Sequence, residues 1–181
     1  SLNITERKQM EDALRESEAR FRSYFELPLG GRAITSPTKG WLDVNSGLCD
    51  MLGYTKSELM QMTWAELTHS EDIAIDLTQF NRVMAGEIDG YTIEKRFIHK
   101  DGRSIHTHMA VQCIRLPDGS IDYFVALLLD ITMLKQVVAE LSESGDLLRE
   151  VGRVAKVGGW NLDLITNELT WTEETYLIHE L

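Results

Sequence analysis

Three consecutive segments in the middle of the chain alternate between apolar and polar residues, and this pattern restricts the fold more than any other feature. The segments span residues 91–100, 103–115 and 120–129, and an Asp-Gly pair lies at each junction. Alternation with a period of two is typical of strands with one buried face, and Asp-Gly between such runs is a strong hairpin signal. The sequence therefore predicts three long antiparallel strands that follow one another in the chain.

The residues before these strands predict two shorter strands and several helices. Residues 30–45 form two short apolar runs around a turn that contains proline and glycine. Asn45 is suited to cap a following short helix that Gly53 would end, and Thr-Lys-Ser-Glu at 55–58 fits a capping box. Residues 73–84 carry apolar side chains at helical spacing. An α+β domain follows, with a five-stranded antiparallel sheet and short helices on one face.

An internal repeat predicts how the chain is organised. Residues 3–22 align with residues 130–149 with eight identities in twenty positions, and each copy is followed by Gly-Gly. Such self-similarity is typical of tandem units. The predicted organisation is a linker helix from a preceding unit over residues 1–19, a complete domain over 20–132, a second linker helix over 133–155, and the truncated start of a second domain over 156–181.

Both linker helices are predicted to be amphipathic. In the first, the apolar residues Met10, Leu14, Phe21 and Tyr24, together with Ser17, lie on one seam whose spacings alternate between four and three. This pattern is typical of a coiled-coil dimer seam, but two or three heptads fit equally well a single helix that packs on its own domain. Both interpretations stay open.

Four motifs occur in order between residues 20 and 132: WLDVNSGLCDMLGYTKSEL, THSED, GEIDGYTIEKRFIHKDGRSI and a closing Asp-Ile-Thr. Their series resembles the PAS sensor domains in their bacterial S-box form. The resemblance implies a PAS fold, flanked by N-terminal and C-terminal amphipathic helices. Two positions depart from the family pattern: Ser70 stands where a proline is usual, and His106 where tryptophan is frequent.

The resemblance also implies a function. The chain is expected to be a cytoplasmic sensory and dimerisation module of a signal-transduction protein, of the sensor histidine kinase or diguanylate cyclase type. Asp130, Ile131 and Thr132 would relay the state of the domain to an exit helix and a downstream output domain. The alternative is a ligand-free structural spacer or protein–protein interaction module. The expected partners are neighbouring PAS and output domains and a second copy of the chain, bound through the flanking helices and the outer sheet face.

Composition and motifs argue against several other functions. The net charge of -11 argues against nucleic acid and anionic membranes as partners, and the apolar run at 123–129 is too short to span a bilayer. Cys49 and Cys113 lie in apolar-patterned segments, which favours a reducing, cytoplasmic compartment. Neither a phosphate-binding loop nor a nucleophile with its base is evident, so this fragment is expected not to be an enzyme.

The resemblance implies a cavity between sheet and helices, which in the family holds haem, flavin or small metabolites. The haem-binding members of the family carry their histidine ligand on the helix that corresponds to residues 72–86, and the flavin photoreceptors carry a reactive cysteine in the stretch that corresponds to 63–72. Here the first segment contains no histidine and the second no cysteine, so the resemblance implies neither haem nor covalent flavin. Noncovalent flavin, a small metabolite and no ligand all stay open. Strand and helix periodicity predicts the cavity lining as Ile34, Met51, Trp64, Phe80, Ile98, Thr107, Met109, Val111, Val125 and Leu127.

Three histidines crowd the central hairpin. With a two-residue turn at Asp-Gly, His99, His106 and His108 would share the outer sheet face with Phe97 and Lys95. Two strand histidines and a diagonal neighbour could begin a zinc site. Local sequence supplies neither a fourth ligand nor an orienting carboxylate, so we expect a hairpin without a metal.

Overall fold

The computed structural model describes residues 3–155, 160–163 and 168–171. The chain divides into two compact units, and the boundary along the sequence falls between Thr132 and Met133. The elements of the first unit are α1 (Ile4–Phe25), β1 (Gly31–Thr35), β2 (Trp41–Val44), α2 (Ser46–Leu52), α3 (Lys56–Leu59), α4 (Trp64–Leu67), α5 (Ile73–Met84), β3 (Gly90–Ile98), β4 (Ser104–Arg115) and β5 (Ile121–Asp130). The elements that follow are α6 (Thr132–Ala155), β6 (Trp160–Asp163) and β7 (Glu168–Trp171).

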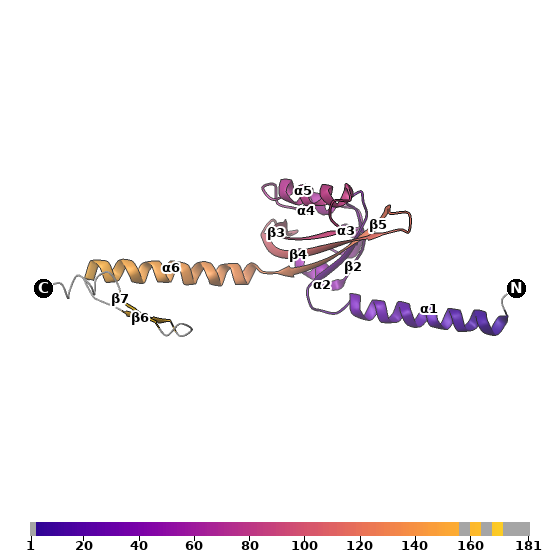
Figure 1. Ribbon diagram of the computed structural model, residues 1–181, viewed down its shortest axis with the longest axis horizontal. Coiled ribbons are helices and arrows are strands. Elements are labelled where there is room, and N and C mark those ends of the chain that lie inside the picture. Colours follow the sequence, from indigo (N-terminus) through magenta and orange to yellow (C-terminus); the bar gives the residue numbers. More distant parts are fainter. Residues whose placement is uncertain (1–2, 156–159, 164–167, 172–181) are drawn as a thin grey trace. The chain divides into compact units, whose positions relative to one another are not determined.

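The first unit is built on a five-stranded antiparallel sheet with the strand order β2-β1-β5-β4-β3. Helices α4 and α5 lie over the strands (Figure 1), and buried side chains of α2 to α5 form one hydrophobic core with the inner sheet face. The predicted α+β fold with a five-stranded antiparallel sheet is confirmed. Because β3 is the last strand of the sheet, only β4 pairs with it along its length.

Local capping explains why several short helices form between β2 and β3. The side chain of Asn45 accepts a hydrogen bond from the backbone N–H of Leu48, and Gly53 ends α2 with a left-handed φ of 77°. Thr55 and Thr63 each begin a helix with a reciprocal capping box. Such caps satisfy backbone donors that a four-residue helix cannot satisfy itself. The predicted roles of Asn45, Gly53 and Thr55 are confirmed.

The hairpin between β3 and β4 differs from the predicted one. Ile98 pairs with Ser104, whereas a two-residue turn at the Asp-Gly pair would place it opposite Ile105, so residues 99–103 form the loop. The loop is closed because the N–H of His99 donates to the carbonyl of Arg103 at 2.9 Å, and the N–H of Gly102 donates back to the carbonyl of His99 at 2.8 Å. A shift of one residue in pairing exchanges the two faces of a strand.

This register corrects the predicted faces of β3. Phe97 and Lys95 lie opposite Ile105 and Thr107, on the inner face, and both are buried. The prediction that they share the outer face with the histidines was therefore wrong. Among the residues that the structure describes, no three His, Cys, Asp or Glu side chains gather closely enough to hold a metal ion.

Helix α1 continues to Phe25, past the predicted linker boundary at residue 19, and its C-terminal end is fixed to the domain. The guanidinium of Arg22 lies 3.2 Å from the Asp43 carboxylate, and the Glu26 carboxylate accepts a hydrogen bond from the backbone N–H of Ser46 at 3.0 Å. The seam residues Met10, Leu14, Phe21 and Tyr24 are exposed. The dimer seam stays a prediction.

The second unit contains α6 and the antiparallel pair β6 and β7. On α6, apolar side chains that include Leu134, Val137, Leu141 and Leu148 are exposed. Most of the predicted second-domain start at residues 156–181 lies outside the described residues. No helix in the described part of the chain is long and apolar enough to cross a membrane.

Candidate functional site

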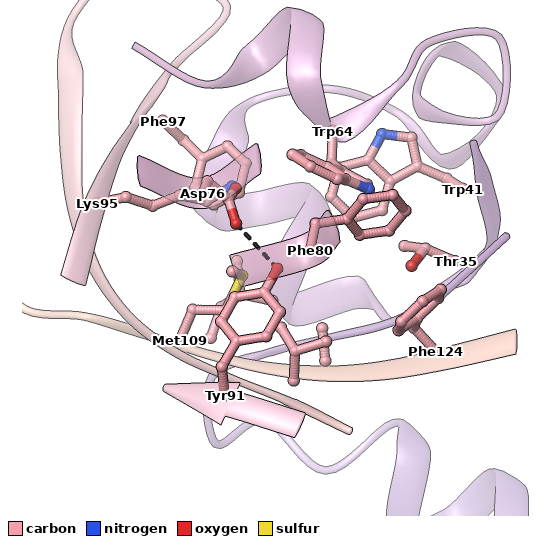
Figure 2. Close-up of a pocket in the computed structure, with 13 residues that line it drawn as sticks. Thr35, Trp41, Trp64, Asp76, Phe80, Tyr91, Lys95, Phe97, Met109 and Phe124 are labelled. Carbon is pink, nitrogen blue, oxygen red and sulfur yellow. Dashed lines mark hydrogen bonds and ion pairs between the residues drawn. The ribbon is translucent and has the colours of Figure 1, made fainter. Parts of the chain in front are cut away.

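A small cavity lies between the inner sheet face and helices α4 and α5. Its volume is about 20 Å³. Its walls are mostly aromatic and aliphatic, with a few polar side chains among them (Figure 2). The lining residues are Thr35, Trp41, Trp64, Asp76, Phe80, Tyr91, Lys95, Phe97, Met109, Val111, Phe124, Ala126 and Leu128.

A buried ion pair forms one wall of this cavity. The ammonium of Lys95 contacts the Asp76 carboxylate and donates to the Thr68 hydroxyl at 3.0 Å. The Tyr91 hydroxyl donates to the other oxygen of Asp76 at 2.9 Å (Figure 2). The side chains of Lys95 and Asp76 are 1% and 0% exposed. Both charges are therefore withdrawn from solvent, and each is compensated mainly by the other.

The secondary structure dictates where these groups meet. Lys95 points inward because it lies two residues from both Ile93 and Phe97 on β3 and therefore shares their buried face. Asp76 lies one turn after Asp72 on α5, and these two carboxylates hold the helix to the edge strand. Asp72 accepts hydrogen bonds from the backbone N–H and the guanidinium of Arg96, the shortest at 2.7 Å. The start of helix α5 is thus anchored to β3 by one half-buried ion pair and one buried ion pair.

The apolar surroundings shift the protonation of the buried groups. Burial lowers the pKa of the Lys95 ammonium from its ordinary value, and the Asp76 carboxylate opposes this shift. Burial, and after it the charge of Asp76, raises the pKa of the Tyr91 phenol well above its usual value. The Lys95 nitrogen also lies 4.1 Å from the ring centroid of Phe97 and 4.8 Å from that of Trp64. These distances allow cation–π attraction that offsets part of the desolvation cost.

Hydrogen-bond donors with no partner among the described residues remain on side chains that line the cavity. Both carboxylate oxygens of Asp76 are engaged, whereas the Lys95 ammonium uses two of its three N–H groups in hydrogen bonds within the described part of the chain. The indole N–H of Trp41 is buried and finds no acceptor there. An unpaired buried donor costs about 1–3 kcal/mol. The site is therefore suited to a group that accepts hydrogen bonds.

The size of the cavity limits what it holds in this conformation. A volume of about 20 Å³ admits one water molecule, since a water needs roughly 10–15 Å³ of such space. Pockets for cofactors and drug-sized ligands measure roughly 300–1,000 Å³. A flavin or haem would therefore require Trp64, Phe80 and Met109 to move apart.

The predicted lining residues divide between the two sheet faces. Trp64, Phe80, Met109 and Val111 line the cavity. Ile34, Val125 and Leu127 instead line a groove on the outer face, so their predicted inward orientation was wrong. The inner positions of β5 belong to Phe124, Ala126 and Leu128. Because β5 is apolar on both faces, alternation of hydrophobicity could not tell its faces apart.

The remaining predicted lining residues lie elsewhere. Ile98 belongs to the outer face of β3, as a consequence of the hairpin register. Met51 lines a shallow surface depression beside Gly30. Thr107 is fully buried next to Lys95 but is not among the lining residues, and its hydroxyl donates to the backbone carbonyl of Lys95 at 2.9 Å.

Sequence reasoning missed Asp76, Lys95 and Tyr91 as lining residues. One signal for Asp76 existed, because it interrupts the apolar stripe of α5 one turn before Phe80. A charge on an apolar helix face indicates a buried partner. Lys95 offered no such signal until the register of β3 was known.

The three predicted relay residues join the sheet to helix α6. The carboxylate of Asp130 accepts a hydrogen bond from the backbone N–H of Thr132 at 2.8 Å. The N–H of Ile131 donates to the carbonyl of His106 at 2.8 Å, and the N–H of His106 donates to the Thr132 hydroxyl at 3.0 Å. Strand β4 therefore contacts the first residue of α6 directly.

Comparison with known proteins gives consistent results. Residues 42–128 match the family model described as PAS fold. The chain is 35% identical over 169 residues to the probable diguanylate cyclase DgcE of Escherichia coli (strain K12), covering 92% of this chain and 15% of that protein. It is 24% identical to the sensor histidine kinase TmoS of Ectopseudomonas mendocina, covering 83% and 16% respectively. The chain therefore spans only about a sixth of each of these two relatives.

Solved structures show the same architecture. A domain of the sensory box sensor histidine kinase/response regulator from Geobacter sulfurreducens superimposes with a TM-score of 0.54 at 22% identity, covering 65% of this chain and 96% of that one. The PAS domain of the HTR-like protein from Haloarcula marismortui gives a TM-score of 0.55 at 23% identity, covering 68% and 99%.

Proposed function

Because the five-stranded unit has the PAS fold and the chain is related to sensor and cyclase proteins, we propose that it is a sensory module of a larger signalling protein. It would act in the cytoplasm and relay the state of its cavity to an output domain of the kinase or cyclase class. The observation that carries the proposal is the ion pair of Lys95 and Asp76 at the cavity wall. A buried pair is a poor source of stability, so its presence beside a cavity favours a functional role.

The exit from the sheet supports a relay. Hydrogen bonds from His106 and Ile131 link β4 to the start of α6, and Asp130 accepts from the first N–H of that helix. A change in the position of β4 would therefore alter the beginning of α6.

A second candidate function is a spacer or interaction module that senses nothing. The observation that favours it is the cavity volume of about 20 Å³, which leaves no room for a metabolite in this conformation. Under this alternative, the ion pair would serve only to fix α5 on the sheet.

Native mass spectrometry of the freshly purified chain, together with its absorbance spectrum, tests these candidates. A sensor should carry extra mass that is lost on denaturation, or should be stabilised against heat by an extract of small metabolites from its host. Trp41→Phe removes the unpaired indole donor while keeping an aromatic ring, so it should weaken that binding. If the native mass equals that of the polypeptide alone and the extract does not raise the thermal midpoint, ligand sensing is excluded and the spacer function is favoured.

We also propose that the chain forms a homodimer through α1 and the outer sheet face. Phe21 and Tyr24 are exposed on α1, and Ile34, Val125 and Leu127 line an adjacent groove of about 600 Å³. An apolar groove next to an exposed apolar helix seam is suited to a second copy that presents the same seam.

A further inference from the structure

The buried ion pair and the exit motif lie in one row across the sheet. Lys95 of β3 is directly opposite Thr107 of β4, and Thr107 is directly opposite Asp130 of β5. The row begins at helix α5, through Asp76, and ends where helix α6 starts. Residues directly opposite in adjacent antiparallel strands are the closest neighbours that a sheet provides.

Hydrogen bonds link Lys95 to Thr107, and link the next residue of β4 to the exit motif. The Thr107 hydroxyl donates to the backbone carbonyl of Lys95, in addition to the strand pairing. The neighbouring residue, His106, exchanges hydrogen bonds with the start of α6, through its N–H to Thr132 and its carbonyl from Ile131. Lys95 and Thr107 are 3% and 0% exposed, so solvent does not loosen the row at these positions.

We propose that Lys95 is a positioning residue for the exit motif. Its ion pair with Asp76 fixes the position of β3 against α5. Through Thr107 it also fixes the segment of β4 that holds Ile131 and Thr132. The inference rests on the proposed sensory function, because it identifies the group through which a change in the cavity reaches α6.

A relay requires two discrete arrangements, and in this proposal the ion pair supplies them by being either intact or broken. With the pair intact, α5 and β3 are held together inside the core. When an acceptor in the cavity takes the Lys95 ammonium, Asp76 keeps only the Tyr91 hydroxyl, and the buried link between α5 and β3 is lost. A ligand biases such an equilibrium only by its different affinity for the two arrangements.

Amide hydrogen exchange measured by NMR on the whole 181-residue chain tests the proposal. The variant Lys95→Met/Asp76→Asn removes both charges and leaves Tyr91 an acceptor, so no uncompensated charge remains in the core. The amides of His106 and Ile131 should exchange at least about fivefold faster relative to amides of β1, which is the lower end of typical coupling between sites.

Lys100→Met is the matched control. It makes the same change of side chain at a lysine whose ion pair with Glu58 is partly exposed, with a distance of 2.6 Å, and which lies outside the row. Its His106 and Ile131 amides should exchange at wild-type rates. Unchanged rates for these amides in the folded double variant, or equal acceleration in the control, would overturn the proposal.

A reciprocal measurement uses the other end of the row. Thr132→Val removes the hydroxyl that accepts the His106 N–H, and linkage requires that this change be felt at Lys95. The side-chain nitrogen resonance of Lys95 should shift, while that of Lys100 stays in place. If a ligand is found by native mass spectrometry but neither variant shows coupling, the sensory function stands and the role of Lys95 is refuted. If the variants show coupling between Lys95 and the exit motif but native mass spectrometry finds no ligand, the role of Lys95 stands and ligand sensing is refuted.

Discussion

Replacement of Lys95 by methionine should destabilise the domain far more than an ordinary surface substitution. The substitution leaves the Asp76 carboxylate, which is 0% exposed, with only the Tyr91 hydroxyl as a partner. Removing one member of a buried ion pair typically costs about 3–5 kcal/mol. Small domains have total stabilities of about 5–15 kcal/mol, so a large share of the stability is lost.

The loss should be largely reversed when the second charge is also removed. Lys95→Met/Asp76→Asn leaves no uncompensated charge, and buried pairs replaced by neutral side chains of similar volume often cost about zero. We expect the double variant to lose no more than about 2 kcal/mol, because the asparagine still accepts from Tyr91 but fits the methionine imperfectly. The two substitutions are therefore expected to be strongly non-additive.

Urea unfolding measures these differences, with the fluorescence of Trp41 and Trp64 reporting on the cavity and circular dichroism on the helices. With a slope of roughly 2 kcal/mol per molar urea, Lys95→Met should lower the midpoint by about 2 M. Lys100→Met, which breaks an exposed pair, should cost no more than about 1 kcal/mol. A loss below about 1 kcal/mol for Lys95→Met, or a double variant that loses the sum of both single losses, would refute the reasoning.

Three further outcomes are expected. The Arg96 guanidinium lowers the pKa of Asp72 to about 2 against 3.8 for the free group, so this carboxylate stabilises the fold above about pH 4. That contribution, about 1–2 kcal/mol after allowance for solvent screening, should be lost between about pH 4 and pH 2, and Asp72→Asn should remove this part of the pH dependence in chemical unfolding. Gly53→Ala should lower the thermal midpoint, because φ is 77° at this position and an added Cβ would lie 2.4 Å from the His99 ring. A second substitution, His99→Ala, removes the clash but not the backbone strain, so it should restore only part of the lost stability. Full restoration would show that the backbone is unstrained. Deletion of residues 1–20 should convert a dimer to a monomer in analytical ultracentrifugation, and a monomer in both cases would remove the proposed seam.

The sequence predicted the strands, caps and exit motif because each depends on local patterns. Asp-Gly pairs between alternating runs located β3, β4 and β5, and Asn45 and Thr55 begin their helices as expected. These features follow from interactions within a few residues, such as a side chain that caps the next turn.

The faces of two strands could not be predicted from the same patterns. β5 carries apolar side chains on both faces, so nothing in its sequence distinguishes Val125, which is 36% exposed, from Phe124, which is 1% exposed. In β3, the hairpin loop is longer than the Asp-Gly pair alone indicates, and this reversed the predicted orientation of Lys95. Its partner Asp76 lies in a distant segment, and only the assembled fold brings the two charges together.

The two anchors of helix α5 respond differently to salt. At 1 M ionic strength the Debye length is about 3 Å, which screens exposed charges but hardly affects buried ones. The ion pair of Asp72 with Arg96 is partly open to solvent and weakens under these conditions, whereas the pair of Asp76 with Lys95 does not. In concentrated salt, the N-terminal end of α5 should therefore loosen from the sheet edge first, and the helix should pivot about its buried attachment one turn further along.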